Sequence, residues 1–152
     1  MSHLDTLHSD KINALFWSGD INNMYLGHQM QEIFKDRIYD PYFVGKKDLI
    51  VMDLGANCGV FSIYAAPYAK QVLAFEPSPD HYEALSLMID WNKLTNVLPH
   101  KLAISNTDGE ANFYQLKNKT MNSLNPAHMP QSVPPIKVKT IRLDTSKRCQ
   151  II

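Results

Sequence analysis

The sequence predicts an α/β domain built around a mostly parallel sheet. Through the middle of the chain, short apolar runs and helix-like stretches alternate in the order strand, helix, strand, helix, strand. That order is typical of right-handed crossovers between parallel strands. The chain has 152 residues, of which 45% are apolar, so it is long and apolar enough to form one domain with a core.

Composition and charge exclude several classes of protein. Lys+Arg and Asp+Glu number 15 each, so the basic surplus of an electrostatic nucleic-acid binder is absent. No apolar run approaches the roughly 18 residues of a membrane span, and the first residues hold no apolar signal region. Cys58 and Cys149 cannot form a disulfide framework. We therefore expect a cytoplasmic protein that binds neither nucleic acid nor membrane.

Residues 1–45 are predicted to form a helical extension, and residues 46–152 the α/β domain. One helix face is indicated by four apolar residues at helical spacing: Leu26, Met30, Ile33 and Phe34. Residues 39–44, which include Pro41, are predicted to be a connector.

The apolar run at 49–54 predicts a strand that is buried on both faces of a parallel sheet. A second apolar run at 60–66 predicts a helix that Pro67 closes. Residues 71–75 predict the second strand. In the helix that follows, Ser78 is expected to be the N-cap, and Leu85 and Ile89 are expected to be buried.

Residues 100–104 predict a third strand, which should begin near Pro99 at a sheet edge because proline cannot donate to a ladder. Two alternating runs, 111–116 and 136–143, are expected to pair antiparallel after the turn signal Asp108-Gly109. The segment 117–135 between them predicts a long loop without regular structure.

The segment from Asp53 to Gly59 lies between a predicted strand and a predicted helix. Gly55 and Gly59 remove side chains that would keep a ligand from the backbone, and the helix offers free N–H groups. Glu76 follows the second strand, 23 residues after Asp53, where an acidic residue can accept both hydroxyls of a ribose. A tight turn without a ligand, and a solvated strand end at Glu76, are the alternatives.

The glycine spacing bears on which nucleotide could bind. Asn57 stands where the dinucleotide fingerprint has its middle glycine, which disfavours a pyrophosphate and hence a dinucleotide-dependent oxidoreductase. Asp53 would repel phosphate but suits a cationic ligand. The histidines and cysteines show no metal-ligand spacing, so we expect no metal, and Cys58 is interpreted as a small turn residue instead of a nucleophile.

These segments resemble a known family. The string Val51-Met52-Asp53-Leu54-Gly55-Ala56-Asn57-Cys58-Gly59-Val60-Phe61-Ser62 resembles the first motif of class I methyltransferases that use S-adenosylmethionine (SAM), in its FkbM-like branch. The resemblance extends over roughly 39–144, through 74–77, Asn92, 102–105 and 140–144. It implies a Rossmann-like class I methyltransferase fold.

The resemblance also implies a cofactor-binding set: Asp53, Gly55, Ala56, Asn57, Gly59, Glu76, Pro77, Ala103 and Ile104. Asp53 and the turn would hold the aminoacyl end of SAM, with the Asn57 amide assisting. Glu76, beside Pro77, would bind the ribose hydroxyls. Ala103 or Ile104 at the end of the third strand would approach the adenine through backbone groups. No catalytic residue is identified.

The expected reaction is methyl transfer, most simply to oxygen, on a small-molecule or saccharide acceptor. Family members continue beyond the segment like Leu143-Asp144 into a fourth strand with an acidic motif that this sequence lacks. We therefore expect a truncated chain, the cofactor half of the domain, in which strand 49–54 is an exposed edge open to self-association or a partner. The alternative is an inactive SAM-binding remnant or a half-domain that needs a partner chain.

Overall fold

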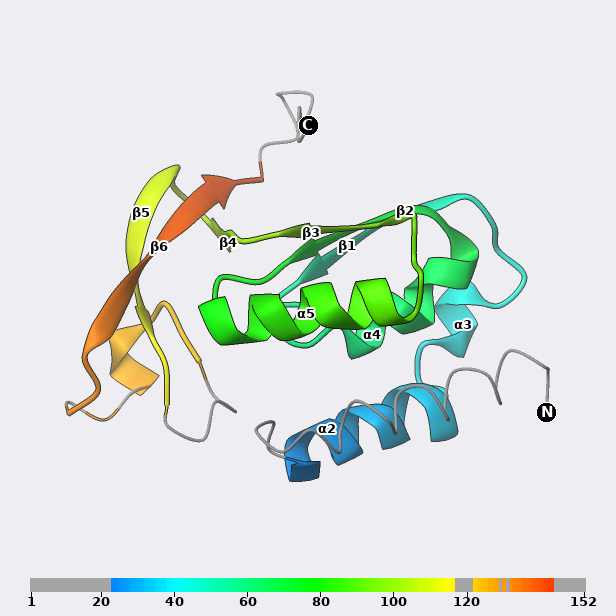
Figure 1. Ribbon diagram of the computed structural model, residues 1–152, viewed down its shortest axis with the longest axis horizontal. Coiled ribbons are helices and arrows are strands. Elements are labelled where there is room, and N and C mark those ends of the chain that lie inside the picture. Colours follow the sequence, from blue (N-terminus) through cyan, green and yellow to red (C-terminus); the bar gives the residue numbers. More distant parts are fainter. Residues whose placement is uncertain (1–22, 117–121, 129, 131, 144–152) are drawn as a thin grey trace.

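The computed structural model describes residues 23–116, 122–128, 130 and 132–143. Within them it contains two three-stranded sheets, with strand orders β1-β2-β3 and β4-β6-β5 (Figure 1). Three parts of the sequence predictions lie outside these residues: residues 1–22 of the helical extension, residues 117–121, 129 and 131 of the long loop, and residues 144–152. No helix among the described residues has the length and apolar character to cross a membrane.

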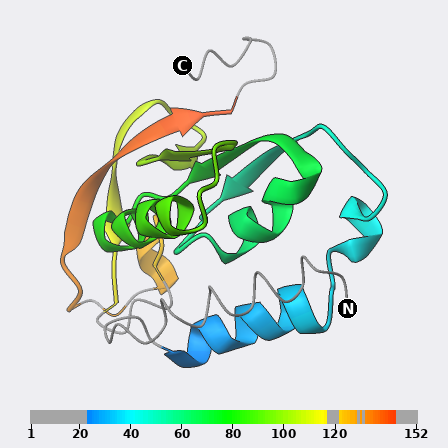
Figure 2. The same cartoon turned by 45° about the vertical axis from the view of Figure 1, so that its right-hand side comes forward.

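The first sheet is wholly parallel and confirms the predicted fold class. Its strands are β1 (Leu49–Leu54), β2 (Ala69–Phe75) and β3 (Val97–His100). Between β1 and β2 lie α4 (Val60–Ala65) and the 3-10 turn η2 (Ala66–Tyr68), which contains Pro67 as expected. Between β2 and β3 lies α5 (Pro79–Trp91). Figures 1 and 2 show α4 and α5 on the same side of this sheet, a Rossmann-like arrangement.

The hydrophobic core lies between this side of the sheet and the helices that cover it. Val72 and Ala74 of β2 and Leu85 of α5 are fully buried, and Ile89 is buried beside them. The predicted cap is present: the Ser78 Oγ accepts a hydrogen bond of 3.4 Å from the His81 backbone N–H. The capping residue and the apolar spacing of α5 were therefore read correctly from the sequence.

The N-terminal elements pack against α4. They are α2 (Asn23–Met30), the π-helical turn η1 (Gln31–Lys35) and the short helix α3 (Asp40–Phe43). Ile33 and Phe43 are buried in the core, and the Phe43 ring lies 5.4 Å from the Tyr64 ring of α4. The predicted helix is present with a π-helical end, and the predicted connector contains one helical turn that has Pro41 in its first turn.

The prediction that β1 is buried on both faces is wrong. Ile50, Met52 and Leu54 are 60%, 39% and 52% exposed. In the described residues β1 pairs only with β2, so it is an edge strand, and helices cover only one face of the sheet. A continuous apolar run predicts two apolar faces, but it does not tell what covers them.

The predicted third strand at 100–104 is wrong in its bounds. Residues 97–100 form β3 of the first sheet, and a turn, in which the Leu102 N–H donates to the His100 carbonyl, separates it from β4 (Ala103–Ser105). Ala103 and Ile104 therefore lie in the second sheet and not at the end of the third parallel strand. Pro99 lies inside β3, opposite Ala74, and is tolerated because β3 is the sheet's other edge, as predicted.

The second sheet contains the predicted antiparallel pair. β5 (Gly109–Tyr114) and β6 (Pro135–Arg142) pair antiparallel, and β4 pairs parallel to β6. The intervening loop is less irregular than expected, since it holds the 3-10 turn η3 (Pro126–His128) and a bridge between Tyr114 and Ser123.

Gly59 provides a test of how closely α5 approaches the turn after β1. It has φ of +89°, and a Cβ added there would lie 2.6 Å from the Cδ1 of the fully buried Leu85. We predict that Gly59→Ala lowers the free energy of unfolding by about 1–3 kcal/mol, because the core must shift. Urea denaturation followed by circular dichroism measures this change.

Gly27→Ala is the matched control. Gly27 lies in α2 with nothing within 4 Å of an added Cβ, so alanine should leave stability unchanged or raise it by up to about 1 kcal/mol. Equal stabilities of the two variants would contradict the tight contact between the turn and α5.

Candidate functional site

The turn after β1 folds over the end of β2. Gly55, Asn57 and Gly59 all have positive φ, at +81°, +52° and +89°. The backbone N–H groups of Gly55 and Ala56 both donate to the Phe75 carbonyl at 2.9 Å. The glycines therefore serve a left-handed backbone path that other residues rarely adopt.

Glu76 joins this turn to the start of α5. One carboxylate oxygen accepts a hydrogen bond of 2.8 Å from the Asn57 backbone N–H, and the other accepts one of 2.8 Å from the Ser78 backbone N–H. Glu76 is 4% exposed, which excludes the alternative of a solvated strand end. Burial raises the pKa of Glu76, the two N–H groups oppose that rise, and the charge of Asp53 adds to it.

Asp53, at the end of β1, is a second buried carboxylate. One of its oxygens accepts a hydrogen bond of 2.6 Å from the Ser62 hydroxyl of α4. Burial raises the pKa of Asp53, and its hydrogen bonds with Ser62 only partly oppose the rise. Carboxylates that end two neighbouring parallel strands are thus both kept away from water, an arrangement common at functional sites.

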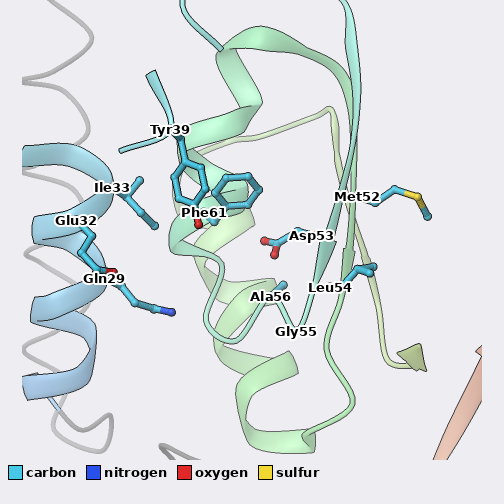
Figure 3. Close-up of a pocket in the computed structure, with 10 residues that line it drawn as sticks. All are labelled: Gln29, Glu32, Ile33, Tyr39, Met52, Asp53, Leu54, Gly55, Ala56 and Phe61. Carbon is cyan, nitrogen blue, oxygen red and sulfur yellow. The ribbon is translucent and has the colours of Figure 1, made fainter. Parts of the chain in front are cut away.

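A cavity of about 260 Å³ lies beside the end of β1 (Figure 3). Its lining combines β1 and the turn with the N-terminal helices: Gln29, Glu32, Ile33, Tyr39, Met52, Asp53, Leu54, Gly55, Ala56 and Phe61. In Figure 3 the Asp53 carboxylate points toward α2, and the Gln29 side chain extends toward it from the opposite wall. The rings of Tyr39 and Phe61, 4.8 Å apart, lie next to each other at one end. The cavity can hold a small polar group, not a whole nucleotide.

Only some of the predicted site residues line this cavity. Asp53, Gly55 and Ala56 line the cavity. The other predicted residues do not line it: Asn57, Gly59, Glu76, Pro77, Ala103 and Ile104. Asn57 and Glu76 are tied to one another beside it, whereas Ala103 and Ile104 lie in β4.

Sequence reasoning missed the wall that the N-terminal helices provide. Gln29 and Glu32 are polar residues beside the apolar positions that predicted the helix, and Tyr39 lay in the predicted connector. The one sequence signal is that Gln29 is four residues before Ile33, so a polar side chain shares a face with a core residue.

Cys58 is not a nucleophile. It is 1% exposed, and burial raises the pKa of its thiol to about 12, so it stays protonated at neutral pH. In the part of the chain that the structure describes, no group of His, Cys, Asp and Glu side chains could hold a metal ion.

No family model matches the chain. It is 37% identical over 97 residues to Methyltransferase sdnD of Sordaria araneosa, which is 61% of this chain and 37% of that protein. It is 29% identical over 82 residues to Methyltransferase 1 of Beauveria bassiana, which is 51% of this chain and 32% of that protein. The chain thus spans about a third of the length of these curated relatives.

Solved structures give partial similarity. YcgJ from Bacillus subtilis matches 42% of this chain and 27% of its own, with 17% identity and a TM-score of 0.39. Trm5b from Pyrococcus abyssi matches 51% of this chain and 26% of its own, with 25% identity and a TM-score of 0.40. Two of the proteins that the chain matches in sequence are thus named as methyltransferases.

Buried Asp53 gives a prediction on stability and pH. Its folded-state pKa lies above its unfolded value, so between these two values the folded state binds more protons and stability falls as pH rises. Asp53→Asn should therefore raise the free energy of unfolding at pH 7. The fall of this free energy as the pH rises above about 4 should also be smaller in the variant than in the wild type. Urea denaturation between pH 4 and pH 8 tests this.

Asp90→Asn, on the exposed side of α5, is the control and should leave the pH profile unchanged. If Asp53→Asn is less stable than the wild type throughout, then Asp53 is a structural residue, held for its hydrogen bond with Ser62.

Proposed function

We propose that this chain is the cofactor-binding part of a SAM-dependent methyltransferase. The observation that carries the proposal is the buried Asp53 carboxylate, which faces a cavity directly beside a glycine turn. SAM has two positive groups, an ammonium and a sulfonium, at the end opposite its adenine. A carboxylate in a cavity of this size suits that end of the cofactor.

In the proposal, different residues bind different parts of the cofactor. Asp53 and the turn at 55–59 hold the aminoacyl end, with Asn57 assisting. Each oxygen of Glu76 accepts one backbone N–H in the structure, so the carboxylate keeps acceptor sites for the ribose hydroxyls. Pro77 follows Glu76 directly, and in the proposal backbone groups of β4, at Ala103 or Ile104, approach the adenine.

SAM supplies an electrophilic methyl group on its sulfonium. This chain's residues contribute by orientation: they fix the cofactor so that an acceptor atom can approach the methyl group in line. We propose an FkbM-like enzyme that methylates an oxygen of a small molecule or a saccharide, which the motif at 51–62 supports. A general base is needed only where the acceptor is a poor nucleophile.

A second candidate is a SAM-binding half-domain that needs a partner chain, or a remnant without activity. It is favoured by apolar side chains that are exposed on the face of the first sheet away from α4 and α5: Ile50, Met52 and Leu54 of β1 and Leu98 of β3. Exposed apolar side chains on an edge strand favour association with another chain or a second copy.

Binding of S-adenosylhomocysteine tests the proposal. Isothermal titration should detect binding with a Kd below about 0.1 mM, which corresponds to a free energy of about −5.5 kcal/mol. Asp53→Asn should weaken it at least about tenfold because a charge-assisted contact is lost, whereas Asp90→Asn should bind as the wild type does.

Two outcomes would contradict the proposal: no heat from the wild type, or equal affinity of Asp53→Asn and the wild type. Binding of NADH in a fluorescence titration would instead favour an oxidoreductase.

The second candidate predicts association through β1. Sedimentation should show wild-type dimers or larger species at about 0.1 mM, and the double variant Ile50→Lys, Leu54→Lys should shift them to monomer. Leu87→Lys is the control, because Leu87 is 55% exposed on α5, away from this edge. A wild type that stays monomeric contradicts self-association.

A further inference from the structure

One wall of the cavity belongs to neither β1 nor the glycine turn. It comes from α2 and η1, which contribute Gln29 and Glu32. In Figure 3 both side chains lie across the cavity from Asp53. Ile33, next to Glu32, is 5% exposed in the core and anchors this wall against α4.

Gln29 has unmet hydrogen-bonding capacity. Its Oε1 atom is buried and has no hydrogen-bond partner in the structure. A buried amide oxygen without a partner is destabilising, and such groups usually mark a place where a ligand or a water completes the bonding. The atom without a partner is an oxygen, which only accepts hydrogen bonds, so it fits a donor such as an ammonium group.

The charges of the residues that line the cavity indicate the charge of the ligand that it binds. Asp53 and Glu32 are carboxylates on facing walls, and none of the described residues that line the cavity carries a positive charge. The rings of Tyr39 and Phe61 add aromatic surface of the kind that attracts cations. The cavity is therefore built for a cationic hydrogen-bond donor that carries a second polar group.

We infer that Gln29 and Glu32 bind the ammonium at the aminoacyl end of the cofactor: Glu32 shares the ammonium with Asp53, and the Oε1 atom of Gln29 accepts a hydrogen bond from it. This inference rests on the proposed function and deepens it, because it makes α2 and η1 part of the cofactor site. The cavity then selects ligands that carry the aminoacyl group over ligands that have only the adenosine.

Two probes separate the two ends of the cofactor. S-adenosylhomocysteine has the aminoacyl group, whereas 5′-methylthioadenosine has the same nucleoside and sulfur without it. Isothermal titration of both probes would be done with the wild type, Glu32→Gln, Gln29→Leu and the control Glu83→Gln, which is exposed on α5.

Glu32→Gln and Gln29→Leu should each weaken S-adenosylhomocysteine binding about tenfold, the loss expected for a charge-assisted hydrogen bond. Binding of 5′-methylthioadenosine should change by less than about twofold, because no contact to the nucleoside is removed. The Glu83→Gln control should bind both probes as the wild type does. Circular dichroism of each variant checks that the fold is intact.

The outcomes separate this inference from the proposed function. If the wild type binds S-adenosylhomocysteine and both variants bind it equally well, the inference is wrong and the proposed function stands. An equal loss for both probes also overturns it, since the variants would then act on the fold. If the wild type binds neither probe, the proposed function and the inference both fail.

Discussion

The hydrogen bonds from two backbone N–H groups to the Glu76 carboxylate hold together the end of the sheet on which the candidate site depends. The Asn57 and Ser78 N–H groups come from the turn after β1 and from the cap of α5, so one side chain positions two loops. Burial makes this arrangement costly for a charged group, and the two donors offset part of that cost. Asp53 lies at the end of the neighbouring parallel strand β1, and its charge adds to the rise in the pKa of Glu76.

The first sheet has two unlike faces, and they account for the shape of the candidate site. One face is covered by α4 and α5, against which the N-terminal helices pack through Ile33 and Phe43. The cavity forms where these helices meet the end of β1. The other face leaves Ile50 and Leu54 exposed, so in the described residues a cavity for a small polar group lies beside an edge strand with exposed apolar side chains. Ligand binding and association with another chain would thus involve the two sides of a single strand.

Sequence signals within one element predicted that element's structure well, whereas contacts between distant elements could not be predicted from them. The Ser78 cap and the burial of Leu85 follow from chemistry within one helix, and both are present. No glycine or proline marks the break between β3 and β4 at Leu102. The sequence pattern therefore predicted one strand where the structure has two, in different sheets. Of the candidate site, the sequence identified the turn and both carboxylates. It could not find Gln29, because helix periodicity tells which face is buried but not which strand end that face meets.

The most direct test of a cofactor site between the glycine turn and the N-terminal helices is an NMR titration with S-adenosylhomocysteine, in which backbone amide shifts report contact residue by residue. We expect saturable shifts at residues 53–59 and 76–78, together with shifts at 29–39 across the cavity. Shifts confined to β5 and β6, or no shifts at millimolar ligand, would contradict a site at this end of the sheet.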